Sequence, residues 1–495
     1  MRAVGFDHEK YVKMQSEHIR ERYAKFDGKL YLEFGGKLFD DYHASRVLPG
    51  FHPDSKVQML KTLSDQAEIV IVINASDIEK NKLRSDLGIT YDSEVLRLID
   101  SFRDMGLYVG SVALSRYAGQ ASADSFQKYL ESMGIPVYRH YPIPGYPSDV
   151  ETIVSDDGYG KNEYIKTERP LVVVTGPGGG SGKMATCLSQ LYHEHKRGVR
   201  AGYAKFETFP IWNLPLRHPV NIAYEAATAE LNDVNMIDSF HLEAYGETTV
   251  NYNRDIEIFP VVNAMFERIW GESPYKSPTD MGVNMAGYCI CDDEICKEAG
   301  RQEIIRRYYA ALCAKRKGTS QREDEVQKIK LLMSQANITP QNRPVIAAAL
   351  EREAQTGLPA AAIELNDGRI LTGKTSGLLG PSSSLLLNAL KALGNIDRSA
   401  HLISPTIIEP IQHLKLEHMG NKNPRLHTDE VLVALSICAV EDELAECAMA
   451  QLEKLAGAEV HSTVILSEVD ERVFKRLGCN LTCEPTYQTQ SLYHK

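Results

Sequence analysis

A glycine-rich stretch that ends in a lysine carries the clearest chemical signal in the sequence. Residues 171–175 read Leu-Val-Val-Val-Thr, which predicts a buried strand, and five of the next seven residues are glycine. Glycines let successive backbone N–H groups converge on an anion, and a following helix N-terminus adds partial positive charge. Lys183 would then reach the outer phosphates of a nucleotide. The pattern therefore predicts a phosphate-binding loop made of Gly176, Gly178, Gly179, Gly180, Ser181, Gly182, Lys183 and Met184.

This stretch departs from the P-loop pattern G-x-x-x-x-G-K-[ST] in two ways. Five residues, not four, separate Gly176 from Gly182, and Met184 stands where a Ser or Thr would hold Mg²⁺. Thr186, Ser181, or carboxylates with water are the alternative ligands. A glycine-rich turn with an exposed lysine is the alternative interpretation of the whole stretch. Binding of a nucleotide is better supported than its hydrolysis.

Further polar residues follow the loop. Lys205 and Glu207 lie near the end of the next predicted strand, and His218 begins the helix after it. Between the loop and this strand, the chain is similar to one branch of P-loop proteins, the dethiobiotin synthetase-like ligases and ParA-like ATPases, in which that strand ends at the substrate side. The predicted catalytic residues are therefore Lys183, Lys205, Glu207 and His218. The alternative for Lys205 is a solvated strand end.

Candidate metal ligands come from the carboxylates between residues 232 and 257. Asp233 and Asp238 are the first candidates for Mg²⁺, because carboxylates downstream of a phosphate loop supply its ligands. Charged residues of this kind also occur on any solvent-facing helix. The three cysteines in the stretch 289–296 have no fourth ligand nearby, so ordinary free thiols are predicted there.

Alternating strands and helices predict how these residues are positioned. Apolar strand patterns separated by amphipathic helices are typical of a doubly wound, mostly parallel α/β sheet, whose ligands bind beyond the carboxyl ends of the strands. The loops at 141–149 and 155–160 precede the glycine stretch and are candidates for a lid over it. The predicted strands begin at Leu30, Glu68, Leu107, Ile135 and Leu171.

Length and composition limit the functional class. A chain of 495 residues is too long for one core, so two to four domains are expected. The net charge of −11 argues against a general nucleic-acid binder. Nine scattered cysteines suit a reducing compartment, and the chain shows neither an apolar signal segment nor a membrane-spanning run. We expect a cytoplasmic protein with no nucleic-acid or membrane partner.

Three domains are predicted. Residues 1–275 form a Rossmann- or P-loop-like α/β region, 276–356 a helical segment for bridging or oligomerisation, and 357–495 a C-terminal α/β domain. We expect a homo-oligomer. The last domain combines a hairpin around Asn366, a helix through Leu393, a strand at 401–404, further helices, and strands at 460–466 and 480–483.

The order hairpin, helix, strand, helix is the layout of cytidine-deaminase-like domains. Their zinc chemistry needs a His or Cys two residues before a Glu on the first helix, and P-C-x-x-C on the next. The first helix instead begins Ser382-Ser-Ser-Leu, so the prediction is a deaminase-like layout without the zinc motif. The N-terminus of this helix at Ser382–Ser384 is a candidate anion site, and the domain is alternatively a dimer platform.

Several long motifs extend over the whole chain, among them Tyr31-Leu-Glu-Phe-Gly-Gly-Lys-Leu, Ser181-Gly-Lys-Met-Ala-Thr-Cys-Leu and Ala204-Lys-Phe-Glu-Thr-Phe-Pro-Ile-Trp. In these motifs the chain resembles a family of bacterial proteins that contain domain of unknown function 1846. Members of that family commonly have Pro at the position of Gly179. The resemblance implies a several-domain α/β protein with a deaminase-like last domain, and it implies no established activity.

The functional prediction combines these observations. The chain would bind ATP, another nucleotide or a phosphorylated metabolite at 176–183 and use it in a ligase-like or kinase-like transfer to a small polar metabolite. The alternative is a non-catalytic phosphometabolite sensor or an oligomeric scaffold. A metal hydrolase using residues 218–257 has no motif such as H-E-x-x-H behind it.

Overall fold

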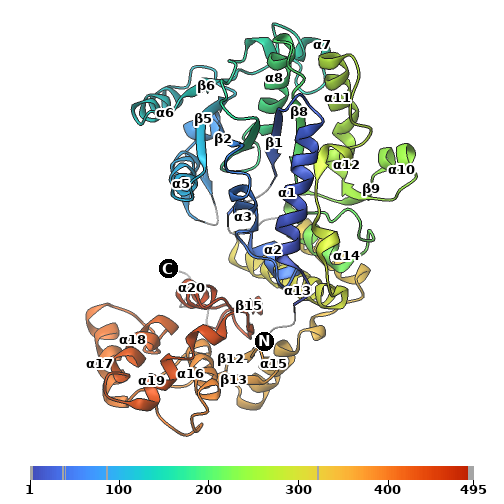
Figure 1. Cartoon of the computed structure of the whole chain (residues 1–495). Helices are drawn as coiled ribbons and strands as arrows, with labels where there is room; N and C mark the ends of the chain where they lie inside the picture. The colour runs from blue at the N-terminus through green and yellow to red at the C-terminus, as the bar shows by residue number, and fades with distance from the viewer. Residues whose placement is uncertain (1–3, 36–37, 40, 85–86, 320–322, 489–495) are drawn as a thin grey trace. The chain divides into compact units, whose positions relative to one another are not determined.

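The computed structural model describes residues 4–35, 38–39, 41–84, 87–319 and 323–488, without the side chain of residue 323. The chain divides into two compact units (Figure 1). The N-terminal unit contains residues 4–225 and 232–300, and the C-terminal unit contains residues 226–231 and 301 onward.

The N-terminal unit is built on a parallel seven-stranded sheet with the order β11-β8-β1-β7-β2-β5-β6. The four central strands, β1, β7, β2 and β8, are almost wholly buried, as their apolar sequences require. The predicted mostly parallel α/β sheet is confirmed. The strands are β1 Leu30–Phe34, β2 Ala67–Asn74, β5 Tyr108–Ser115, β6 Val137–Arg139, β7 Leu171–Thr175, β8 Gly202–Phe206 and β11 Gly282–Val283.

The order of these strands creates a switch point at β1 and β7. From β1 the chain proceeds to β2, β5 and β6 toward one edge of the sheet, and from β7 it proceeds to β8 and β11 toward the other. Right-handed crossovers therefore place α5 and α8 on opposite faces. In open α/β sheets, ligands bind in the crevice beyond the carboxyl ends of the strands at such a point.

Helices cover both faces of this sheet. α8 contacts β1, β7 and β8 and packs against α11, whereas α5 contacts β2 and β5 and α1 contacts β8 and β11 (Figure 1). Two antiparallel strand pairs, β3 Leu83–Arg84 with β4 Ile89–Thr90 and β9 Asn235–Ile237 with β10 Val250–Tyr252, lie outside the main sheet. The helices are α1 His8–Ala24, α2 Tyr42–Val47, α3 Ser55–Lys61, α4 Ala75–Glu79, α5 Tyr91–Asp104, α6 Ala121–Ser132, α7 Val150–Ile153, α8 Lys183–Lys196, α9 Pro219–Ala227, α10 Ser239–Tyr245, α11 Asn253–Trp270 and α12 Pro278–Met281.

The C-terminal unit has its own four-stranded sheet, in the order β13-β12-β14-β15. β12 Ala360–Glu364 is antiparallel to β13 Ile370–Lys374 and to β14 Glu459–Ser462, and β14 is parallel to β15 Asn480–Cys483. The range predicted as a helical segment, 276–356, begins with α12 and with β11 of the main sheet. The remaining helices are α13 Asp293–Lys317, α14 Glu323–Gln335, α15 Pro344–Thr356, α16 Pro381–Leu393, α17 Pro405–His413, α18 Thr428–Cys438, α19 Glu443–Met449 and α20 Glu468–Arg476.

The strand predicted at residues 401–404 is wrong. These residues form no strand, and Leu402 and Ile403 are buried in the core of the C-terminal unit as a loop. Ser404 caps α17, and Pro405 takes the first helical position, where its missing N–H and fixed φ are tolerated. The apolar pair is therefore a core contact before a helix start. Among the described helices, none has both the length and the apolar character needed to cross a bilayer.

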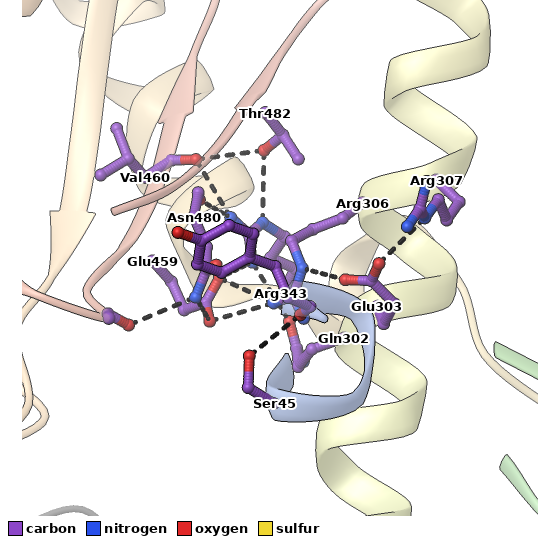
Figure 2. A network of polar contacts seen from close by, with 12 residues as sticks. Ser45, Gln302, Glu303, Arg306, Arg307, Arg343, Glu459, Val460, Asn480 and Thr482 are labelled. Carbon is purple, nitrogen blue, oxygen red and sulfur yellow. Dashed lines mark hydrogen bonds and ion pairs between the residues drawn. The ribbon is translucent and has the colours of Figure 1, made fainter. Parts of the chain in front are cut away.

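A buried arginine connects the start of α15 to β14, β15 and α13 within this unit (Figure 2). Arg343, the N-cap residue of α15, is fully buried, and an arginine side chain has five N–H donors. All five have acceptors, four of them on β14 and β15. Nε donates to the Thr482 hydroxyl (3.2 Å), Nη1 to Glu459 and to Gln302 Oε1 (3.5 Å), and Nη2 to the carbonyls of Val460 (3.0 Å) and Asn480 (2.7 Å).

Candidate functional site

The glycine loop, residues 176–182, follows the central strand β7 and leads into α8 at Lys183. Gly182 is the N-cap of α8 and has a left-handed backbone with φ of 96°, which favours glycine. Two carbonyls of the loop are held from neighbouring strands. Ser115 Oγ donates to the Ser181 carbonyl (2.5 Å), and the Asn74 amide lies 3.5 Å from the Gly180 carbonyl. The loop is thereby fixed against β2 and β5.

The backbone N–H groups of this loop are the feature that points to a ligand. Within the described part of the chain, those of residues 178–180 and 182–185 donate to no backbone or side-chain acceptor. The first hydrogen bond of α8 runs from Thr186 N to the Gly182 carbonyl (2.9 Å). Lys183 Nζ lies 3.4 Å from both the Gly178 carbonyl and Ser181 Oγ. Successive N–H groups beside a helix N-terminus and a lysine form an anion-binding concavity.

Close packing explains three of the glycines. A Cβ at Gly176 would lie 2.4 Å from the Val72 carbonyl, one at Gly178 2.4 Å from the Tyr91 hydroxyl, and one at Gly182 2.8 Å from Ser115 Oγ. A Cβ at Gly179 or Gly180 would meet no atom within 4 Å. Gly176, Gly178 and Gly182 therefore let the loop lie against β2, β5 and α5, whereas residues 179 and 180 form its open side.

A second polar cluster lies at the carboxyl end of β8. Lys205 Nζ contacts Asp255 Oδ2 at 2.5 Å and Glu207 Oε1 at 2.6 Å, and we refer to these three residues as the lysine cluster. β1 lies between β7 and β8, and Glu33 on β1 is in register with both Val174 and Lys205. Two strand spacings, roughly 10 Å, therefore separate the end of β7 from that of β8. The structure brings two of the predicted catalytic residues, Lys205 and Glu207, to one place.

Burial shapes the electrostatics of the lysine cluster. Burial alone would lower the pKa of Lys205, but the carboxylates of Asp255, Glu207 and Glu33 outweigh it and raise that pKa. Burial raises the pKa of Glu207 to about 8, with Lys205 opposing the shift and Asp255 adding to it. A carboxyl group with a pKa in this range exchanges protons near neutral pH, which is a property of general acids and bases.

Sequence reasoning missed Arg116 and passed over Asp255. Arg116 directly follows β5 and Ser115, is exposed, and has a left-handed backbone with φ of 50°. Its guanidinium makes no hydrogen bond or ion pair with any described residue. A signal for Arg116 was available, since it is a basic residue at a predicted strand end.

Three predicted site residues, His218, Asp233 and Asp238, make their contacts outside the glycine loop and the lysine cluster. His218 Nε2 lies 3.0 Å from Asp293 Oδ1, and its Nδ1 accepts from Val220 N at 3.3 Å. The pKa of His218 is lowered, because the effect of burial outweighs the opposing effect of the Asp293 carboxylate. Within the described ranges His218 contacts neither Lys183 nor Lys205. The geometry therefore gives His218 a role at the start of α9.

The two predicted metal ligands, Asp233 and Asp238, lie in different surroundings. Asp233 pairs with Arg254 at 2.6 and 2.9 Å. Asp238 caps α10 through His241 N (3.0 Å) and accepts the Thr279 hydroxyl (2.6 Å). Among the described residues, no group of three or more His, Cys, Asp or Glu side chains is arranged to hold a metal ion.

The alternative hydroxyl ligands are also engaged. Thr186 is buried, with its hydroxyl 3.3 Å from His140 Nδ1, and Ser181 is buried beside Lys183. Met184 is half-buried at the first turn of α8. None of the nine cysteines forms a disulfide, those at 289, 291 and 296 included.

Two family models match the chain. Domain of unknown function DUF1846, N-terminal, matches residues 4–337, and its C-terminal counterpart matches residues 341–493. This chain is a member of the DUF1846 family. A UPF0371 protein of Streptococcus pyogenes serotype M3 is 57% identical to it over 495 residues, and the match covers 100% of both chains. A UPF0371 protein of Streptococcus uberis is 56% identical over the same length with the same coverage.

Membership of the DUF1846 family confirms the resemblance drawn from the sequence motifs. The N-terminal family model contains both the glycine loop and the lysine cluster, and the C-terminal model contains the second sheet. Because the family is defined as a domain of unknown function, any inference about function depends on the geometry of the site.

Proposed function

We propose that the glycine loop binds the phosphate groups of a nucleotide, with ATP as the first candidate, or of a phosphorylated metabolite. One observation carries this proposal: the N–H groups of residues 178–180 and 182–185 have no acceptor in the described chain, at the carboxyl end of the central strand. Donors left without a partner are costly unless water or a ligand meets them. An anion at a helix N-terminus next to a switch point satisfies them.

Two cationic side chains bind the phosphates of this ligand. Lys183 turns from the Gly178 carbonyl toward the outer phosphate, and Arg116 approaches from the end of β5. The long contacts of Lys183, both at 3.4 Å, support such a movement because they are weak and easily exchanged. A loop of this kind is P-loop-like in its lysine and its helix start, and unlike a P-loop in its spacing and in Met184.

Mg²⁺ does not fit the residues first predicted to hold it. Arg254 neutralises Asp233, Thr279 and the α10 backbone occupy Asp238, and Met184 replaces the hydroxyl ligand. Any Mg²⁺ therefore accompanies the nucleotide.

The acceptor of a transferred group binds at the lysine cluster. Lys205 and Glu207 lie two strands from the glycine loop, a separation that suits a triphosphate on one side and a small polar metabolite on the other. Glu207, with its pKa near 8, takes the proton of the acceptor as that acceptor bonds to phosphorus and the bond to the leaving diphosphate breaks. The reaction class is a kinase-like or ligase-like transfer.

A non-catalytic phosphometabolite sensor or scaffold is the second candidate. It is favoured by Met184 and by the internal pairing of Lys205 with Asp255 and Glu207, which leaves the cluster stable without substrate. Mg²⁺-dependent consumption of ATP with a panel of small polar acceptors separates the two, since a sensor binds without consuming.

The C-terminal unit and the cellular setting complete the proposal. The predicted strand at 401–404 is absent, but the β12–β13 hairpin, α16, β14 and α20 still follow the order hairpin, helix, strand, helix, with α17, α18 and α19 between α16 and β14. This order supports a deaminase-like layout without zinc chemistry. Val433, Ile437 and Val440 are exposed near the end of α18, which supports a homo-oligomer that light scattering would detect. Nine free thiols support a cytoplasmic location.

Substitution at Gly179 tests the ligand site without disturbing the fold, because a Cβ there meets no atom within 4 Å. In Gly179→Asp a carboxylate at the open side of the loop repels phosphate, whereas Gly179→Asn is a neutral control of the same shape. ATP should raise the Tm of the wild type and of Gly179→Asn, and leave that of Gly179→Asp unchanged. Equal Tm shifts in all three proteins would overturn the proposal.

A further inference from the structure

The C-terminal unit contains a small cavity, the α16 cavity, at the start of α16. Its volume is about 30 Å³, room for roughly two water molecules or one compact anion. Four segments form it: the start of α16, the loop 423–427, residues 464–470 at the beginning of α20, and Gln488. The polar side chains of its lining include Ser382, Arg425, His427, Ser467 and Asp470.

Ser382 is a buried hydroxyl that faces this cavity. Its exposed fraction is 1%, and among the described residues its hydroxyl has no hydrogen-bond partner. The neighbouring Ser383 hydroxyl, in contrast, donates to the Leu426 carbonyl at 2.8 Å. The first hydrogen bond at this helix start runs from Ser384 N to the Gly380 carbonyl, so the N–H groups of Ser382 and Ser383 are also available. Three donors at this helix start thus have no acceptor among the described residues, and the buried Ser382 hydroxyl lines the cavity, which favours an acceptor from outside the chain.

Asp470 and His427 complete the wall of the cavity. Asp470 accepts from the Thr428 N–H (2.8 Å) and from the Ser467 hydroxyl (2.7 Å), and it lies 3.0 Å from His427 Nδ1. Because Nδ1 is held in this way, Nε2 is the ring atom left for a ligand. The hydrogen bond to Asp470 raises the pKa of His427 against burial and Lys415, with Glu430 adding to the increase.

Arg425 supplies a second cation. Its Nε donates to the Ser376 carbonyl (2.8 Å), which leaves the terminal nitrogens for other partners. With His427 protonated, Arg425 and His427 carry two positive charges against one on Asp470, so the lining favours an anion. Serine, arginine and helix N–H donors are the groups that recognise tetrahedral oxyanions.

We propose that the α16 cavity is a binding site for a small tetrahedral oxyanion, distinct from the glycine loop. Ser382 and the first N–H groups of α16 bind one side of the anion, and Arg425 and His427 bind the other. Inorganic phosphate and sulfate are the probes. The site lies within the C-terminal unit, so its occupation does not depend on a nucleotide at the glycine loop.

Titration calorimetry with phosphate in the full-length Gly179→Asp background isolates this site from the glycine loop. We expect one phosphate per chain. Arg425→Gln should weaken its binding by about tenfold or more, and Ser382→Ala by about threefold to tenfold, because each removes a donor to a charged ligand. Ser384→Ala, the matched control on the same helix turn, should leave the Kd unchanged. Arg425 is half-exposed, so its substitution remains informative if Ser382→Ala fails to fold.

Two results would overturn the proposal. One is the absence of phosphate binding in the Gly179→Asp background, and the other is an unchanged Kd in both Arg425→Gln and Ser382→Ala, which would indicate an adventitious ion only. The glycine-loop proposal is judged separately by ATP binding to the wild type. Sulfate, which stays a dianion, should bind more weakly as pH rises through the pKa of His427, and His427→Gln should remove that dependence.

Discussion

Arg343 and the glycine loop each bring several hydrogen-bond donors together. They differ in whether the protein itself supplies the acceptors. In the C-terminal unit, all five N–H groups of Arg343 have acceptors on the protein (Figure 2). In the N-terminal unit, the N–H groups of 178–180 and 182–185 have none within the described chain. Matched donors hold strands together and contribute to stability. Unmatched donors beyond the carboxyl end of β7 are open to a ligand, and the proposed function assigns them to phosphate binding.

The largest effect is expected at Arg343. Arg343→Ala removes one of the two arginine partners of the Glu459 carboxylate, which keeps Arg306, and takes a donor from the buried carbonyls of Val460 and Asn480. Because buried acceptors lose a donor, the free energy of unfolding should fall by about 2–5 kcal/mol. The first transition in urea unfolding of the full chain measures this. Arg369→Ala, which removes an exposed pair with Asp367, should cost no more than about 1 kcal/mol. A loss at Arg343 as small as that would contradict a stabilising role.

The pH dependence of stability should come next in size. Because the pKa of Glu207 is raised in the folded chain, the folded state binds more protons, and stability should fall as pH rises from about 5 to about 8. The slope should reach at most about 1.4 kcal/mol per pH unit. Glu207→Gln should flatten this part of the profile, and the exposed Glu257→Gln should not. Parallel profiles for all three proteins would show that Glu207 titrates as it does in the unfolded chain.

A smaller effect is expected at Arg116. Arg116→Ala should weaken ATP binding by about tenfold, through loss of one charge-assisted contact, and leave the Tm of the free protein unchanged, because the side chain is exposed and makes no ion pair with the described residues. Fluorescence-anisotropy titration of a labelled nucleotide would measure it. The exposed Arg103→Ala is the control; an equal effect in both would reduce Arg116 to a general surface charge.

Local patterns predicted the framework well. The apolar runs of β2 and β7, the glycine loop and the start of α8 at Lys183 follow from the spacing of neighbouring residues. The strand at 401–404 failed because two apolar residues before a proline also suit a buried loop at a helix start.

The site was predicted less completely because its composition depends on strand order. Asp255 meets Lys205 only because α11 packs against α8 beside β8. Arg116 lies next in the chain to a residue that contacts the loop, Ser115, only because β5 follows β2 in the sheet. Asp233 and Asp238 have the right residue type for Mg²⁺, yet Arg254 and Thr279, both distant in sequence, occupy their carboxylates. Partners separated by twenty or more residues leave no local pattern.

Titration calorimetry of ATP, ADP, GTP and inorganic phosphate, with and without Mg²⁺, tests the central claim most directly. The wild type should bind one nucleotide, and Lys183→Ala should bind it with a loss of about 1.5–3 kcal/mol, tenfold or more in Kd. Lys196→Ala, which changes an exposed lysine at the other end of α8, should bind as the wild type does. If the wild type binds none of the four ligands, the glycine loop is a structural turn and the nucleotide proposal is wrong.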